Sequence, residues 1–193
     1  FFCKNPTLDF KNVRFMINFD MVGRLNDNKD LAINGVGTSS HWSSLINKIN
    51  EEYQFQLILS ESGVGPSDHS SFYYQNIPAI HFFTGQHADY HKPTDDSDKI
   101  NYKGIQDLLC FVKDMIQKSS SIENFDFQET KNNTNNTPSF SVTLGVMPDY
   151  LFTGKGMKID GVSKDKTAFK AGVVKGDIVV RMGNVDVIDM MTY

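Results

Sequence analysis

The chain has 193 residues, a length that accommodates one large domain or two small ones. Its formal net charge of -4 and its scattered Lys and Arg residues argue against a surface for nucleic acid or anionic membranes. No apolar run approaches the roughly 18 residues of a membrane-spanning helix. The two cysteines, Cys3 and Cys110, form no metal-binding pair and no disulfide framework, so we expect buried free thiols.

Strand and helix signals alternate along the first part of the chain. Apolar runs of strand length lie at residues 13–19, 31–36, 55–59 and 79–83. Apolar residues recur at helical spacing in residues 43–52 and 102–117. Nearly continuous apolar strands are typical of a sheet that is buried on both faces. The pattern therefore predicts an α/β sandwich.

A change of composition divides the chain. Residues 119–139 are rich in Asn, Ser and Thr and poor in aliphatic side chains, which predicts an interdomain linker. After them, short strand signals at 140–146, 157–159 and 177–182 accompany a short helix at 168–172. The sequence thus predicts two domains, residues 1–118 and a small β-rich domain at residues 140–193.

Three segments of the first domain carry residues that suit a metal site. Asp20 follows an apolar strand, at the position where open α/β sheets place ligand groups. His91 lies among aspartates that could orient a neutral imidazole for zinc. Ser67, Asp68 and His69 lie where a loop runs into a helix, but no nucleophile elbow surrounds Ser67, which disfavours a serine hydrolase. On spacing alone, a strand-ending Asp20 and a solvated loop around His91 are the simpler interpretations.

The order and contexts of these segments, together with the strand at residues 77–83, resemble the co-catalytic dizinc aminopeptidases. This family includes the bacterial leucyl-type aminopeptidases, and its relatives include glutamate carboxypeptidase II and glutaminyl cyclase. The resemblance extends from about Leu8 to Gln117. It implies the downstream part of a three-layer zinc-peptidase fold with a mixed sheet.

The resemblance also implies roles for individual residues. Asp20 and His91 would each bind one of two zinc ions in the complete enzyme. Ser67 would hydrogen-bond the Asp20 carboxylate, and Asp68 and His69 would lie on the substrate side. These roles are expectations that come from the family alone.

Other residues that the family needs would lie upstream of Asp20, namely a His ligand, a bridging Asp, a Glu ligand and the general-base Glu. The residues before Asp20 contain no His and no Glu, and Asp9 has the wrong context. We therefore expect a chain truncated at both ends that is inactive alone and binds zinc weakly or not at all. We also expect an exposed sheet edge through which the chain could associate with another chain.

The second predicted domain resembles the bacterial PDZ domains of periplasmic proteases. Residues 168–178, Ala-Phe-Lys-Ala-Gly-Val-Val-Lys-Gly-Asp-Ile, carry most of this resemblance. PDZ domains bind extended peptides by strand addition and hold the terminal carboxylate on backbone N–H groups. The resemblance implies that an incomplete PDZ-like domain binds peptide carboxylates through Gly154, Lys155, Gly156 and Met157. An ordinary hairpin turn is the alternative for these four residues.

The sequence therefore favours a zinc-dependent aminopeptidase that acts on peptides and carries a PDZ module. A non-catalytic peptide-binding homologue of the same fold is one alternative. A glutaminyl cyclase-like acyltransferase with a single zinc is another, although peptide capture by a PDZ module suits proteolysis better. The resemblance also implies a periplasmic or secreted location.

Overall fold

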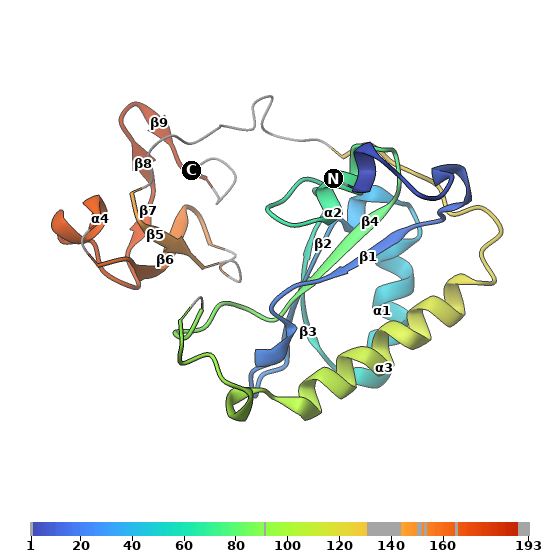
Figure 1. The fold of residues 1–193 in the computed structure, drawn as a ribbon, viewed down its shortest axis with the longest axis horizontal. Helices are drawn as coiled ribbons and strands as arrows, with labels where there is room; N and C mark the ends of the chain where they lie inside the picture. Colours follow the sequence, from blue (N-terminus) through green and yellow to red (C-terminus); the bar gives the residue numbers. More distant parts are fainter. Residues whose placement is uncertain are drawn as a thin grey trace. The chain divides into compact units, whose positions relative to one another are not determined.

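The computed structural model describes residues 2–90, 92–130, 144–149, 152, 154–164 and 166–188 (Figure 1). The chain divides into two compact units, and each unit has an apolar core of its own. The first unit comprises Phe1–Gly85 with Asp95–Lys131, and the second comprises Gln86–Thr94 with Asn132–Tyr193. None of the helices in the described ranges combines the length and the apolar character that a membrane span needs.

A four-stranded sheet forms the centre of the first unit. Its strands lie in the order β1 (Met16–Phe19), β4 (Ala79–Phe83), β2 (Asp30–Asn34) and β3 (Gln56–Ser60). β1 is parallel to β4 and β2 is parallel to β3, whereas β2 and β4 are antiparallel. The sheet is therefore mixed, and the α/β class predicted from the sequence is confirmed. Two short 3-10 helices precede β1, namely η1 (Phe2–Lys4) and η2 (Phe10–Asn12). Three more lie in the later connections, namely η3 (Val22–Arg24), η4 (Val36–Thr38) and η5 (Ser97–Lys99).

Two long helices, α1 (Trp42–Tyr53) and α3 (Tyr102–Ser119), cover one face of this sheet (Figure 1). Their buried side chains recur every three or four residues, so each helix turns one apolar side toward the strands. The core that they enclose includes Leu31, Ile33, Trp42, Ile46, Ile49, Ile80, Phe82, Leu108, Phe111 and Met115. Both helices were predicted from this spacing.

The short helix α2 (His69–Tyr73) lies on the opposite face of the sheet. Successive residues of a strand point to opposite faces, and Ile80 and Phe82 belong to the core under α1 and α3. His81 between them therefore points the other way, and its ring stacks on the ring of His69. Helices thus lie on both faces, as in the sandwich that the sequence predicted.

The predicted linker needs a correction, because residues 119–130 pack on the first unit. Phe125 is buried in the main core, where its ring centroid lies 4.5 Å from that of Trp42. Thr130 is also buried, and its backbone N–H donates to the hydroxyl of Tyr73 at 2.9 Å. The segment is poor in aliphatic residues, but one aromatic side chain and specific hydrogen bonds anchor it. The rest of the predicted linker, residues 131–139, lies outside the described residues.

Asp126 adds a polar anchor to the same segment. Its Oδ1 accepts hydrogen bonds from the hydroxyls of Ser39 at 2.8 Å and Ser40 at 2.9 Å, just before α1 begins. Burial acts to raise the pKa of Asp126, but these hydrogen bonds outweigh it, so the pKa is lowered. The ionised carboxylate therefore fixes the segment to the start of α1.

The second unit is small and β-rich, as predicted. Its elements are β5 (Val146–Pro148), β6 (Met157–Val162), α4 (Thr167–Lys170), β7 (Ile178–Val179), β8 (Arg181–Met182) and β9 (Val185–Asp186). Strands β5, β6 and β7 form one antiparallel sheet, and β8 pairs with β9. The strand predicted at 177–182 is thus divided between two sheets, and most of the one predicted at 140–146 lies outside the described residues. The likeness to a PDZ domain stays a prediction.

The expectation of buried thiols was wrong. Cys3 is half-buried and Cys110 is exposed, and both are free. Cys110 lies on the outer side of α3, because the neighbouring Phe111 and the preceding Leu108 turn into the core.

Candidate functional site

Asp20 lies directly after β1, at the end of the sheet where β1 and the parallel strand β4 both finish. Its backbone N–H donates to the carbonyl of Phe82 at 3.2 Å, which keeps Asp20 in line with the strand. The next residue, Met21, has a left-handed backbone with φ 51°, and this turns the chain away from the sheet. The Thr84 hydroxyl donates to the Met21 carbonyl at 2.7 Å and holds the turn. The carboxylate of Asp20 is left exposed at the end of the strand.

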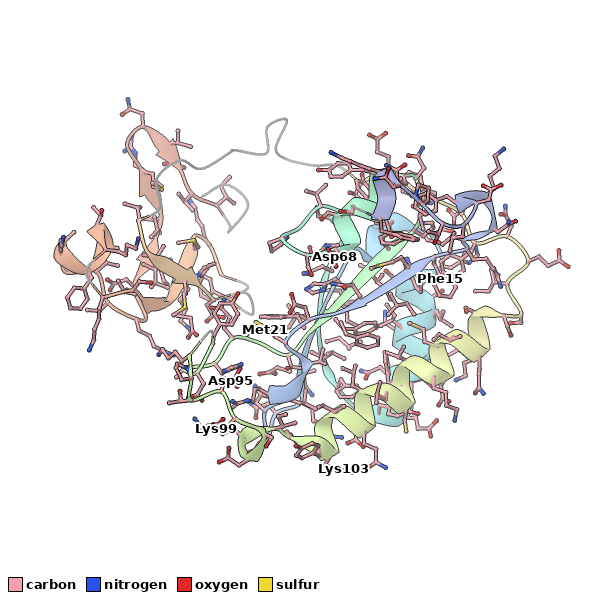
Figure 2. All side chains as sticks on the ribbon, viewed as in Figure 1. Phe15, Met21, Asp68, Asp95, Lys99 and Lys103 are labelled. Atoms are coloured by element: carbon pink, nitrogen blue, oxygen red, sulfur yellow. The ribbon has the colours of Figure 1, made fainter. Side chains whose placement is uncertain are left out.

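The hydrogen bond expected between Ser67 and Asp20 is present. The Ser67 hydroxyl donates to Oδ2 of Asp20 at 3.2 Å and joins two segments that lie 47 residues apart in the sequence. Figure 2 labels Met21 just after β1 and Asp68 at the start of α2, next to these two residues in the chain. The structure thus brings together two of the predicted site residues, Asp20 and Ser67.

Two residues that the sequence analysis missed extend this contact into the sheet. The side-chain amide nitrogen of Asn18, Nδ2, lies 2.8 Å from the Ser67 oxygen and 2.8 Å from Nδ1 of His81. Asn18 and His81 are register partners in the β1–β4 pair, so the strand pairing itself makes them neighbours. We call Asp20, Ser67, Asn18 and His81 the Asp20 network. A signal was available, because His81 is the one ionisable residue in the otherwise apolar strand at 79–83.

His69 is fully buried, and its expected place on the substrate side stays a prediction. Its ring is parallel to that of His81 within 5° at a centroid distance of 4.8 Å. Neither ring nitrogen of His69 has a hydrogen-bond partner among the described residues. Burial, and to a smaller extent the nearby His81, lower the pKa of His69 to about 4. Burial also lowers the pKa of His81, although the charge of Asp20 opposes this shift. Both rings are therefore neutral near pH 7.

Two further predicted site residues, Asp68 and His91, are not members of the Asp20 network. Asp68 is exposed at the N-cap position of α2, and its side chain makes no capping hydrogen bond there. Its position agrees with a place on the substrate side, which stays a prediction. His91 lies outside the described residues, so its predicted role as a zinc ligand is untested.

The described residues do not form a complete zinc site. No group of three or more His, Cys, Asp and Glu side chains in the described ranges is arranged to hold a metal ion. The Asp20 carboxylate has the right chemistry for one zinc ligand, because a carboxylate oxygen binds zinc and one of its oxygens is already oriented by a hydroxyl. Asp20 therefore fits one ligand position of a zinc ion, and no described residue completes the set.

Comparison with protein families shows the family to which the chain belongs. The model of Peptidase family M28 matches residues 1–134, which is more than half of the chain. The chain belongs to Peptidase family M28. No curated protein matches the sequence.

Solved structures of three bacterial aminopeptidases are similar to part of the chain. The LapA aminopeptidase of Legionella pneumophila is 23% identical over 58% of this chain and 33% of its own, with a TM-score of 0.48. The zinc aminopeptidase BSAP of Bacillus subtilis is 23% identical over 65% of this chain and 34% of its own, with a TM-score of 0.49. The aminopeptidase of Aneurinibacillus sp. strain AM-1 is 23% identical over 70% of this chain and 32% of its own, with a TM-score of 0.49. The chain thus spans about a third of the length of these aminopeptidases.

The four residues predicted to bind a peptide carboxylate lie before and at the start of β6. The backbone N–H of Gly156 donates to the carbonyl of Ile188 at 2.8 Å, so this donor is already used. Met157 is buried in the core of the second unit together with Ile159 and Val187. Gly154 and Lys155 are exposed. Carboxylate binding here stays a prediction, and it would depend on the exposed half of the loop.

Proposed function

We propose that residues 1–134, which match Peptidase family M28, form part of the catalytic domain of a zinc-dependent aminopeptidase that removes N-terminal residues from peptides. Membership in Peptidase family M28 supports peptide hydrolysis. The observation that carries the proposal is the Asp20 carboxylate, which lies at the end of β1 with a hydroxyl hydrogen bond from a distant loop. A strand end of this kind is where open α/β folds gather the groups that bind ligands.

Each chain residue would have a defined task in this enzyme. Asp20 would bind zinc through an oxygen of its carboxylate, and Ser67 would limit the rotation of that carboxylate. His91 would be a ligand of the other of two zinc ions. The exposed Asp68 would face the substrate. Zinc, when bound, acidifies a water molecule and polarises the scissile carbonyl.

We also propose that the remaining ligands and the general-base Glu come from outside residues 1–193. The sequence before Asp20 contains no His and no Glu, and the described residues hold no complete metal cluster. The 193-residue chain would then bind zinc weakly and turn over no substrate. A non-catalytic peptide-binding homologue is the second candidate, and the same incomplete donor set is the observation that favours it.

For the second unit we propose capture of peptide C-termini, supported by its resemblance to PDZ domains and by its antiparallel sheet of β5, β6 and β7. The exposed Lys155 would add a favourable charge for the carboxylate. A periplasmic or secreted location, and association through the edge strands of the first unit, belong to the same proposal.

Zinc content and turnover provide the test. Both are measured for the 193-residue chain and for a longer protein that contains it, by mass spectrometry and by hydrolysis of leucine p-nitroanilide. We expect zinc and chelator-sensitive hydrolysis in the longer protein, and little of either in the 193-residue chain. Zinc without hydrolysis in the longer protein would favour the non-catalytic homologue. Stoichiometric zinc and turnover in the short chain would contradict the proposed origin of the missing residues.

A further inference from the structure

We propose that Asn18 and His81 are positioning residues for Asp20, which act through the hydroxyl of Ser67. This inference rests on the proposed role of Asp20 as a zinc ligand, but its first step concerns only the direction of hydrogen bonds within the described chain. Neither residue touches the exposed carboxylate oxygen that would bind zinc. Both determine whether Ser67 has a hydrogen to donate to it.

The directions of the hydrogen bonds follow from the atoms involved. The amide nitrogen of Asn18 carries two hydrogens and no acceptor site, so it donates to both of its neighbours, Ser67 and His81. Because the Ser67 oxygen accepts from Asn18, its own hydrogen is available for Oδ2 of Asp20. Nδ1 of His81 must accept, so the ring hydrogen of neutral His81 lies on Nε2. The donors and acceptors of the Asp20 network are therefore fixed. Asn18 donates to His81 and to Ser67, and Ser67 donates to Asp20.

The orientation of the Asn18 amide decides this direction. One atom, Nδ2, makes both contacts at 2.8 Å. If the amide rotated by half a turn, its oxygen would take the same place and would accept the Ser67 hydrogen. Asp20 would then lose its donor, and the carboxylate could rotate about its side-chain bonds. The lone pair on Nδ1 of His81 favours the orientation in which Asn18 Nδ2 faces the ring, because the amide oxygen would be repelled by that lone pair.

The surroundings of His81 keep that acceptor in place. His81 is only 5% exposed, and the parallel ring of His69 covers one face of its ring. Burial disfavours the charged imidazolium, so Nδ1 keeps its lone pair near neutral pH. The strand register fixes the backbones of Asn18 and His81 opposite each other, which leaves little freedom for the pair to separate. A buried, oriented acceptor in the sheet thus controls a hydroxyl at its edge.

Two variants at His81 distinguish its role as a hydrogen-bond acceptor from a role in packing alone. His81→Asn places an amide oxygen close to the position of Nδ1 and keeps an acceptor for Asn18. His81→Leu has a similar size and keeps the site apolar, but it offers no acceptor. Asn18→Asp removes the donors and keeps the shape of the side chain. Thermal unfolding followed by circular dichroism identifies any variant that has lost the fold.

The first readout is nitrogen NMR of the 193-residue chain labelled at histidine. We expect His81 to show an unprotonated Nδ1 and a protonated Nε2, and we expect Asn18→Asp to change the resonance of Nδ1. A hydrogen on Nδ1 in the unaltered chain would overturn the proposal. This readout requires neither zinc nor activity, so it stands even if the proposed function fails.

The second readout is the zinc dissociation constant of the longer protein, measured by competition with a chromophoric chelator. We expect His81→Leu and Asn18→Asp to weaken zinc binding by about 10- to 100-fold, the range found when a residue behind a ligand is lost. We expect His81→Asn, which keeps an acceptor for Asn18, to bind zinc almost as tightly as the unaltered protein. Equal losses in His81→Asn and His81→Leu would overturn the positioning role and leave packing alone. If the unaltered protein binds no zinc, the proposed function fails, and the NMR result alone decides the hydrogen-bond direction.

Discussion

The two faces of strand β4 are one residue apart in sequence and opposite in chemistry. Ile80 and Phe82 point into an apolar core under α1 and α3, where shape and area determine stability. His81 points to the other face, where its hydrogen bond to Asn18 leads to Ser67 and Asp20. A single strand therefore holds the fold with one face and orients a polar group with the other. Substitutions on the two faces should have different consequences.

The largest loss of stability is expected on the apolar face. Phe82 is fully buried, and its ring meets that of Phe111 edge-on, so Phe82→Ala leaves a cavity and should lower the free energy of unfolding by about 3–5 kcal/mol. Denaturant unfolding measures the change. Leu109→Ala on the exposed side of α3 is the control and should change stability by less than about 0.5 kcal/mol. A Phe82→Ala variant as stable as this control would contradict the described core.

The edge of the same core gives the next prediction. Phe125 is 9% exposed and packs on Trp42 and Phe15, so Phe125→Ala should cost about 3 kcal/mol, at the low end of the range for Phe truncation. Asn124→Ala, one residue earlier and exposed, should be nearly neutral. If both substitutions were neutral, residues 120–130 would behave as the linker that the sequence predicted.

The polar face should appear in the pH dependence of stability. Since the pKa of His69 is about 4 in the folded chain and about 6.5 when unfolded, the unfolded state binds more protons between these values. Protonation of His69 therefore does not affect the free energy of unfolding above about pH 6.5. As the pH falls from there toward about 4, the unfolded state takes up a proton that the folded state does not, and the free energy of unfolding decreases. We expect His69→Phe, which keeps a ring next to His81, to flatten this part of the curve of unfolding free energy against pH. An unchanged slope would argue against the burial of His69.

The smallest effect on stability is expected at the network's outer end. Ser67 is half-buried and its hydroxyl contacts are near the surface, so Ser67→Ala should lower stability by no more than about 1 kcal/mol. Its effect should instead fall on zinc binding, with a loss of about tenfold in the longer protein. Ser71→Ala on the exposed side of α2 is the matched control and should change neither. If Ser67→Ala destabilised the fold strongly without altering zinc binding, the hydrogen bond between Ser67 and Asp20 would serve stability alone.

Most of the first unit could be predicted from the sequence, because its apolar periods are strong. The strands and both long helices follow from runs and spacings that depend only on neighbours along the chain. Asp20 and Ser67 were found through a family resemblance, since neither has a distinctive local pattern. Asn18 and His81 were missed because their contact depends on the pairing of β1 with β4, which the local pattern does not contain.

The linker prediction failed for a related reason. Composition describes how much apolar area a segment could bury on average, and residues 119–130 have little. It cannot show that one phenylalanine meets a tryptophan at the end of a helix, or that Asp126 meets two hydroxyls before α1. Anchoring by a few specific contacts between distant residues is invisible to a compositional argument.

The packing of residues 119–130 on the first unit has a practical consequence for dividing the protein into fragments. A fragment that ends at residue 118 would lack Phe125, and the rings of Trp42 and Phe15 would be uncovered at the rim of the core. Such a fragment should be recovered mainly as aggregate, whereas one that ends after Thr130 keeps the rim covered. The boundary between the units, as a protease or an expression experiment would find it, therefore lies beyond residue 130.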